Sequence, residues 1–123
     1  MYKILIVDDE QNLRLLYEKE FKKEGYEVIL AESGEEGLKM FQELTPHLVI
    51  LDIKMPGLDG VEAMSKMLSI DNKIPVILNT AYASYQDNFT TWAADAYVVK
   101  SSDIGGLKNR VREILAERYG GQE

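Results

Sequence analysis

The sequence predicts an α/β domain with a doubly wound parallel sheet, in which helices cover both faces of the sheet. Two observations support this fold class. Five short apolar segments rich in β-branched residues alternate with segments that show helical spacing. The apolar segments are also unbroken, which is typical of strands buried on both faces. The expected strands cover residues 4–7, 28–30, 48–51, 76–78 and 96–99.

Helical spacing marks most of the segments between these strands. Gly25 is placed to end the first expected helix, and Ser33 with Glu36 resembles a capping box that opens the second. Residues 84–92 are a weaker helix candidate, because polar and aromatic residues dilute the pattern. Three apolar stripes mark the first, third and fifth helices: Leu13, Leu16, Tyr17 and Phe21; Val61, Met64, Met67 and Leu68; Leu107, Val111, Ile114 and Leu115.

Length and composition bound the class of protein. The chain has 123 residues, no cysteine, 46% hydrophobic residues and a formal net charge of −7. We expect one domain over residues 1–119 and a disordered tail at 120–123. The chain is either a stand-alone protein, which we favour, or one domain of a longer protein. Acidity argues against direct nucleic-acid binding, and it either serves solubility alone or reflects carboxylates grouped around a cation. The first apolar run is too short for a signal peptide or a membrane span, so we expect a cytoplasmic protein.

Polar and charged residues follow the expected strands. Ligands of open parallel sheets bind beyond the carboxyl ends of the strands. The second strand ends on nothing chemically distinctive, in Ala31 and Glu32. The other four ends carry carboxylates, a hydroxyl, an amide or an ammonium group: Asp8, Asp9 and Glu10; Asp52; Asn79 and Thr80; Lys100.

This set has a chemical use. Carboxylates crowded at one edge of a sheet repel one another unless a cation neutralises them, and hard carboxylate oxygens favour Mg²⁺. A carboxylate beside bound Mg²⁺ can attack phosphorus and form an acyl phosphate. We therefore expect Asp52 to accept a phosphoryl group, while Lys100 and Thr80 stabilise the charge that spreads over its oxygens.

Four fragments together resemble the receiver domain of bacterial two-component response regulators. They are ILIVDDE at 4–10, DIKMPGLDG at 52–60, the Thr80-Ala81 pair and YVVK at 97–100, in the order and spacing of that family. The resemblance covers nearly the whole chain. It implies a flavodoxin-like (βα)5 fold with strand order 2-1-3-4-5, the order found in flavodoxin and in the chemotaxis member of the family.

The resemblance also implies roles for individual residues. Asp52 is the phosphoacceptor, which receives its phosphoryl group from a histidine of a sensor kinase or of a phosphotransfer protein. Asp9 and Asp52 are direct Mg²⁺ ligands, Asp8 acts mostly through water, and the backbone carbonyl of Lys54 is a further ligand. On this reading the chain is no enzyme for an external substrate and catalyses only its own phosphorylation and dephosphorylation.

A switch is implied at the neighbouring strands. Thr80 and Lys100 each hold a phosphoryl oxygen, and Tyr97 occupies the aromatic switch position. On phosphorylation Thr80 moves toward the phosphate and Tyr97 turns inward. This changes a face built by residues 84–92, the fifth strand and the last helix, which binds a downstream protein and can support a homodimer.

The chain departs from the family pattern in three places. Ser101 stands where the family usually has a proline after a cis peptide bond, and a cis bond before a non-proline residue costs roughly 3 kcal/mol. We therefore predict a trans bond and a mobile loop at 101–106. The stretch 92–96 lacks the glycine often found before the fifth strand. Lys54 and Tyr82 are long at two positions that tune water access, so we expect slow decay of the acyl phosphate.

Other interpretations stay open. The first is a receiver-like interaction module that signals without phosphate. A haloacid-dehalogenase-type phosphatase would need a second aspartate where Lys54 stands, and Asp8 and Asp9 would repel a flavin phosphate. Tyr97 can be a plain core residue, and His47 is expected to be a loop residue without function. Phe89 and Trp92 are expected to pack on the core.

Overall fold

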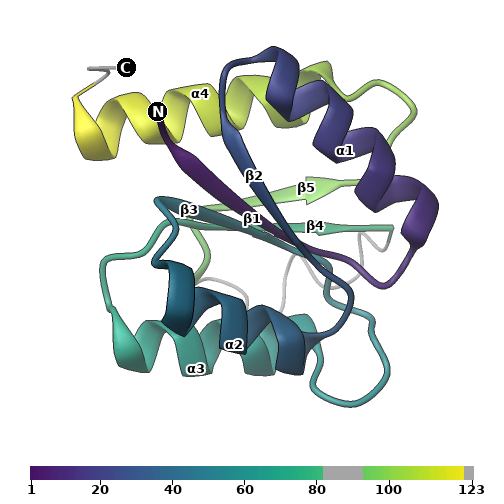
Figure 1. Ribbon diagram of the computed structural model, residues 1–123, viewed down its shortest axis with the longest axis vertical. Coiled ribbons are helices and arrows are strands. Elements are labelled where there is room, and N and C mark those ends of the chain that lie inside the picture. The colour runs from purple at the N-terminus through teal and green to yellow at the C-terminus, as the bar shows by residue number, and fades with distance from the viewer. Residues whose placement is uncertain (82–92, 121–123) are drawn as a thin grey trace.

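Five parallel strands form one sheet in the order β2-β1-β3-β4-β5 in the computed structural model, which describes residues 1–81 and 93–120. Helices α1 and α4 cover one face and α2 and α3 cover the other (Figure 1). This confirms the doubly wound class and the flavodoxin-like strand order. The expected helix at 84–92 lies outside the described residues. The elements are β1 Lys3–Val7, α1 Gln11–Lys23, β2 Glu27–Ala31, α2 Gly34–Leu44, β3 Leu48–Leu51, α3 Gly60–Ile70, β4 Val76–Thr80, β5 Ala96–Val99 and α4 Gly105–Tyr119.

Alternation along the strands builds two cores, one on each face of the sheet. In β1, Leu5 and Val7 point into the core beneath α2 and α3, whereas Ile4 and Ile6 point into the core beneath α1 and α4. All four side chains are fully buried. Both faces of the sheet are covered, which agrees with the unbroken apolar runs that predicted the strands.

The apolar stripe of α1 is narrower than predicted. Tyr17 and Phe21 are buried and Leu13 is partly buried, but Leu16 is 43% exposed, so its assignment to the stripe was wrong. Leu16 lies at the margin of the α1 face that packs against the sheet, so its side chain stays partly in solvent. Gly25 adopts a φ of +92° just beyond the helix, which confirms its expected place at the helix end.

The predicted capping box of α2 is half formed. The Ser33 hydroxyl accepts a hydrogen bond from the Glu36 amide at 3.0 Å, but the Glu36 carboxylate accepts from the Glu32 amide instead of that of Ser33. A complete capping box opens α3, where Asp59 and Glu62 each accept from the other's backbone N–H. The starts of both helices lie close to the carboxyl edge of the sheet, so these caps help to fix its loops.

The amino edge of the sheet is closed by aromatic and ionic contacts. The ring of His47 packs edge-on against Tyr2 and Tyr119, and its Nδ1 accepts a hydrogen bond from the Lys3 amide at 2.9 Å. Asp95 lies just before β5, in the stretch 92–96. Its carboxylate accepts from the Val76 amide at 2.8 Å and pairs with Arg118 of α4.

The peptide bond between Lys100 and Ser101 is trans, as predicted, since the described residues contain no cis peptide bond. The loop after it borders a cavity of about 260 Å³ between β5 and the start of α4. The mobility of residues 101–106 stays a prediction. Among the described residues, no helix is both long and apolar enough to cross a membrane.

Candidate functional site

The register of the sheet aligns the strand ends that the sequence singled out. Val7 of β1 lies opposite Leu51 of β3, so Asp8 and Asp52 leave adjacent strands at the same level. The Asp52 amide donates to the Val7 carbonyl at 2.9 Å. On the other side of β3, Thr80 lies opposite Val99, and the Lys100 amide donates to the Thr80 carbonyl at 2.7 Å. Hydrogen bonds of the sheet itself therefore fix the spacing of the site.

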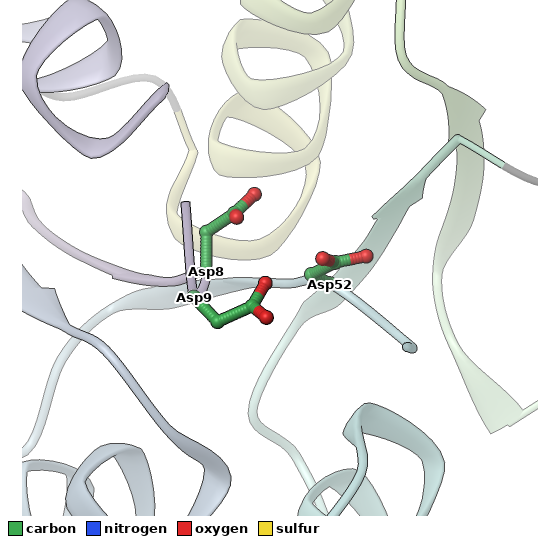
Figure 2. Close-up of side chains that lie close together, drawn as sticks. All are labelled: Asp8, Asp9 and Asp52. Carbon is green, nitrogen blue, oxygen red and sulfur yellow. The ribbon is translucent and has the colours of Figure 1, made fainter. Parts of the chain in front are cut away.

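Three carboxylates meet at this carboxyl edge. One oxygen each from Asp8, Asp9 and Asp52 lies within 4.8 Å of the others, and Figure 2 shows the three side chains close together. Asp8 and Asp52 are only 2% and 5% exposed, whereas Asp9 faces solvent. The group is thus open on one side, and its oxygen donors suit a hard divalent cation.

Lys100 is the cation that the structure places among these carboxylates. Its Nζ lies 2.9 Å from Asp8, 3.2 Å from Asp52 and 3.6 Å from the more exposed Glu10. Burial alone would lower the pKa of Lys100, but its hydrogen bond to Asp8 and the charges of Asp8 and Asp52 outweigh that effect and raise the pKa above its ordinary value. Lys100 is therefore firmly protonated.

Asp52 has an unusual acidity for a carboxyl group. Burial raises its pKa from the ordinary 3.8 to about 6, with further increases from the charges of Asp8 and Asp9. The attraction of Lys100 opposes this rise without cancelling it. The Asp52 carboxylate thus carries its negative charge at a cost, and a positive charge that arrives at the open side of the site relieves that cost.

Gly60 explains how the loop after Asp52 is held. The Gly60 amide, at the start of α3, donates to the Ile53 carbonyl at 2.9 Å. A Cβ atom at this position would overlap the carbonyl oxygen of Asp52 and would lie 2.8 Å from the Ile53 Cα. Only glycine lets the helix approach so closely, so α3 buttresses the backbone of Asp52 directly.

The remaining predicted site residues take different positions. Thr80 is fully buried at the end of β4, and Tyr97 of β5 is partly buried against the core beneath α2 and α3. Lys54 follows Asp52 by two residues in the loop before α3, with its side chain exposed. Tyr82, Phe89 and Trp92 lie outside the described residues.

Sequence reasoning missed two sets of contacts. Glu32, dismissed as undistinctive, lies 3.6 Å from Arg14, whose other terminal nitrogen donates to the Asp8 carbonyl at 2.8 Å. A cation near the start of a helix opposes the helix dipole, and that anomaly was the signal available for Arg14. The second set is a buried hydrogen bond of 2.9 Å from the Asn79 amide to the Tyr17 hydroxyl. These two residues lie 62 positions apart, so no periodicity in the sequence could have paired them.

The fold and this edge define a doubly wound α/β domain with a carboxylate site at the carboxyl ends of its strands. The family model for the response regulator receiver domain matches residues 4–112. The chain therefore belongs to the receiver domain family of response regulators in two-component systems, as its motifs indicated. This class is not that of a conventional enzyme.

Individual relatives agree with this assignment. Sporulation initiation phosphotransferase F of Bacillus subtilis is 37% identical over 115 residues, which cover 92% of this chain and 93% of that protein. The response regulator TrrA of Thermotoga maritima, solved in complex with Mg²⁺-BeF, has a TM-score of 0.91 and 46% identity over 94% of this chain and 100% of that one. TrrA has also been solved with the histidine kinase ThkA, and that structure gives a TM-score of 0.88. The chain spans only 25% to 51% of the length of several other curated relatives.

Proposed function

We propose that the domain is a phosphorylation-dependent signalling switch in which Asp52 is the phosphoacceptor. The observation that carries the proposal is the joint position of three carboxylates and one ammonium group at the carboxyl edge. The oxygens of Asp8, Asp9 and Asp52 lie within 4.8 Å of one another, and Lys100 reaches two of these side chains. A receiver fold needs this arrangement to bring a phosphoryl group to a carboxylate.

The donor set fits Mg²⁺. All three side chains offer hard oxygens, and the exposed Asp9 leaves room for the waters that Mg²⁺ retains. In this proposal Asp9 and Asp52 bind the ion directly, Asp8 acts mostly through water, and the backbone carbonyl of Lys54 is a further ligand. The Mg²⁺-BeF complex of TrrA supports this assignment by similarity. The ion would neutralise the carboxylates and the oxygens of the incoming phosphoryl group.

The chemistry at Asp52 is a phosphoryl transfer. One carboxylate oxygen of Asp52 attacks the phosphorus of a phosphohistidine, the new O–P bond forms, and the N–P bond breaks. The imidazole leaves with the electron pair and takes up a proton from solvent. Lys100 and the Thr80 hydroxyl each hold a phosphoryl oxygen, so the charge of the transferring group meets fixed partners. In hydrolysis, water attacks the phosphorus and the O–P bond to Asp52 breaks, which releases inorganic phosphate and restores the free carboxylate. The domain catalyses both steps on itself alone.

The donor and the output follow from this chemistry. A histidine kinase or a histidine phosphotransfer protein supplies the phosphoryl group, which the TrrA–ThkA complex supports by similarity. Thr80 then moves toward the phosphate and Tyr97 turns inward. The changed face, which includes β5 and α4, binds a downstream protein or a second copy of the domain in the cytoplasm. Within the chain we assign residues 1–119 to the domain and 120–123 to a tail.

The lifetime of the phosphorylated form depends on access of water to the phosphorus. The exposed Lys54 side chain begins two residues from Asp52, and we propose that it shields the acyl phosphate together with Tyr82. An unchanged decay rate in a Lys54→Ala, Tyr82→Ala double variant would contradict this part of the proposal.

Intact mass measurement tests the function. The protein is incubated with Mg²⁺ and acetyl phosphate, beside an Asp52→Ala variant and a sample with a metal chelator. We expect one phosphoryl adduct that requires both Mg²⁺ and Asp52. Absence of an adduct in a folded protein that also fails to bind beryllofluoride would favour an interaction module that signals without phosphate.

A further inference from the structure

Asp8 makes hydrogen bonds through its amide, its carbonyl and its side chain. The Asp8 amide donates to the Ala31 carbonyl at 3.1 Å, and one Asp8 carboxylate oxygen accepts from the Glu10 amide at 2.9 Å. The Asp8 carbonyl accepts a hydrogen bond of 2.8 Å from the Nη1 of Arg14. The backbone and the side chain of Asp8 are thus both anchored before any ligand arrives.

Arg14 reaches this carbonyl from the first turns of α1. Its side chain is only 14% exposed, and its Nη2 lies 3.6 Å from the Glu32 carboxylate beyond β2. The Arg14 amide also makes an early helical hydrogen bond, to the Glu10 carbonyl at 3.1 Å. One side chain therefore connects the end of β1, the end of β2 and the start of α1.

The position is unfavourable for a cation on electrostatic grounds. The amino end of a helix carries partial positive charge, which destabilises a nearby positive side chain. The positive charge of the guanidinium group also opposes the binding of Mg²⁺ to the nearby carboxylates. Against these two unfavourable effects, Arg14 donates a short, charge-assisted hydrogen bond to the Asp8 carbonyl.

We infer that Arg14 is a positioning residue for the acidic site: it fixes the Asp8–Asp9 peptide plane and thereby aims the exposed Asp9 carboxylate at the metal position. The planar peptide unit includes the Asp8 carbonyl and the Asp9 Cα, so a donor that orients the carbonyl also orients the start of the Asp9 side chain. The inference rests on the proposed function, because its target is the Mg²⁺ site named there.

Mg²⁺ titration by calorimetry, without phosphodonor, separates positioning from charge because the two predict opposite signs. Loss of a positive charge alone would tighten Mg²⁺ binding in Arg14→Ala. Loss of an orienting contact should weaken it by about tenfold, as is typical when the support of a metal ligand is removed. The matched control is Arg110→Ala, which removes the same charge from an exposed arginine that pairs with Glu113 on α4. Its affinity should stay within about twofold of wild type, since exposed charges are screened.

Two further measurements keep the test independent of folding. Arg14→Lys keeps the charge but loses the planar fork, so its Mg²⁺ affinity should fall about threefold where a pure charge effect predicts no change. Hydrogen exchange of the Glu10 amide, measured without metal, should be faster in both Arg14 variants than in Arg110→Ala. Thermal unfolding without metal shows whether each variant is folded.

The outcomes are distinct. Weaker Mg²⁺ binding and faster Glu10 exchange in the Arg14 variants support the inference. Mg²⁺ affinity that is unchanged or tighter in folded Arg14→Ala or Arg14→Lys overturns it, while wild-type binding leaves the proposed function standing. A wild-type domain that binds no Mg²⁺ at all overturns the proposed function and this inference with it.

Discussion

The two edges of the sheet treat charge in opposite ways. At the amino edge, Asp95 is balanced by Arg118 and by the Val76 amide, and no like charge is crowded against it in the contacts described. At the carboxyl edge, Asp8 and Asp52 are buried beside each other and share the single ammonium group of Lys100. The carboxylate at the amino edge therefore stabilises the fold, whereas the crowded carboxylates at the carboxyl edge destabilise it.

The two edges therefore differ in purpose: charge at the amino edge supports folding, and charge at the carboxyl edge supports function. Charge at the amino edge is paired because that edge has only to hold the strands together. Charge at the carboxyl edge is left in excess, so that a divalent cation and a phosphoryl group find a site already built for them. Packing and hydrogen bonds between uncharged groups must therefore keep the carboxyl edge folded against this excess of negative charge.

Substitution of Gly60 should cause the largest loss of stability at the carboxyl edge. Gly60→Ala should destabilise the domain by about 3 kcal/mol, because its Cβ would overlap the backbone of Asp52, which cannot yield as a flexible side chain would. Denaturant unfolding measures the change.

The matched control for this prediction is Gly106→Ala in α4. Among the described residues, no atom outside the neighbouring helix backbone lies within 4 Å of the added Cβ there, and alanine should stabilise the helix by about 0.5 kcal/mol. Equal effects of the two substitutions would show that α3 does not buttress the site.

The buried pair of Tyr17 and Asn79 comes next. These residues are only 4% and 2% exposed, so Tyr17→Phe should cost about 2 kcal/mol by leaving the Asn79 amide without its acceptor. A double variant with Asn79→Leu should regain most of that loss, because both partners are then apolar. If Tyr17→Phe unfolds like wild type, the hydrogen bond contributes nothing measurable to this side of the sheet.

The amino edge provides a smaller effect of known sign. Asp95→Asn keeps an acceptor for the Val76 amide but loses the ion pair with Arg118, whose side chain is partly exposed. We expect a loss of about 1 kcal/mol in the free energy of unfolding at pH 7. An Arg118→Gln variant should show a loss of similar size. A gain in either variant would mean that charge at this edge is also in excess.

Sequence reasoning captured the fold and the strand-end residues because both depend on short-range pattern. Unbroken apolar runs predicted the strands, and parallel strands bring the residues that follow them to one edge, as Asp8, Asp52 and Lys100 show. Short-range pattern could not predict the remaining contacts of the site. The carbonyl contact of Arg14, the Tyr17–Asn79 pair and the close approach of Gly60 depend on how helices dock on the sheet, which no local pattern encodes.

In the proposed function, the charge of Asp52 serves phosphoryl transfer and lowers the stability of the domain. Its folded-state pKa of about 6 lies above the ordinary 3.8, so protonated Asp52 favours folding. That contribution is complete below about pH 4 and is lost as the pH rises through 6. Removal of the charge should therefore stabilise the domain at neutral pH, with an effect on the order of 2 kcal/mol.

The most direct measurement is the free energy of unfolding of wild type and Asp52→Asn between pH 4 and pH 8, with and without Mg²⁺. Without Mg²⁺, Asp52→Asn should be the more stable protein at pH 7.5 by about 2 kcal/mol, and the difference should vanish toward pH 4. Saturating Mg²⁺ should stabilise wild type more than the variant and narrow the gap. An Asp52→Asn variant that is less stable than wild type at pH 7.5 without Mg²⁺ would contradict this cost of the Asp52 charge, because Asp52 would then be a stabilising residue like Asp95.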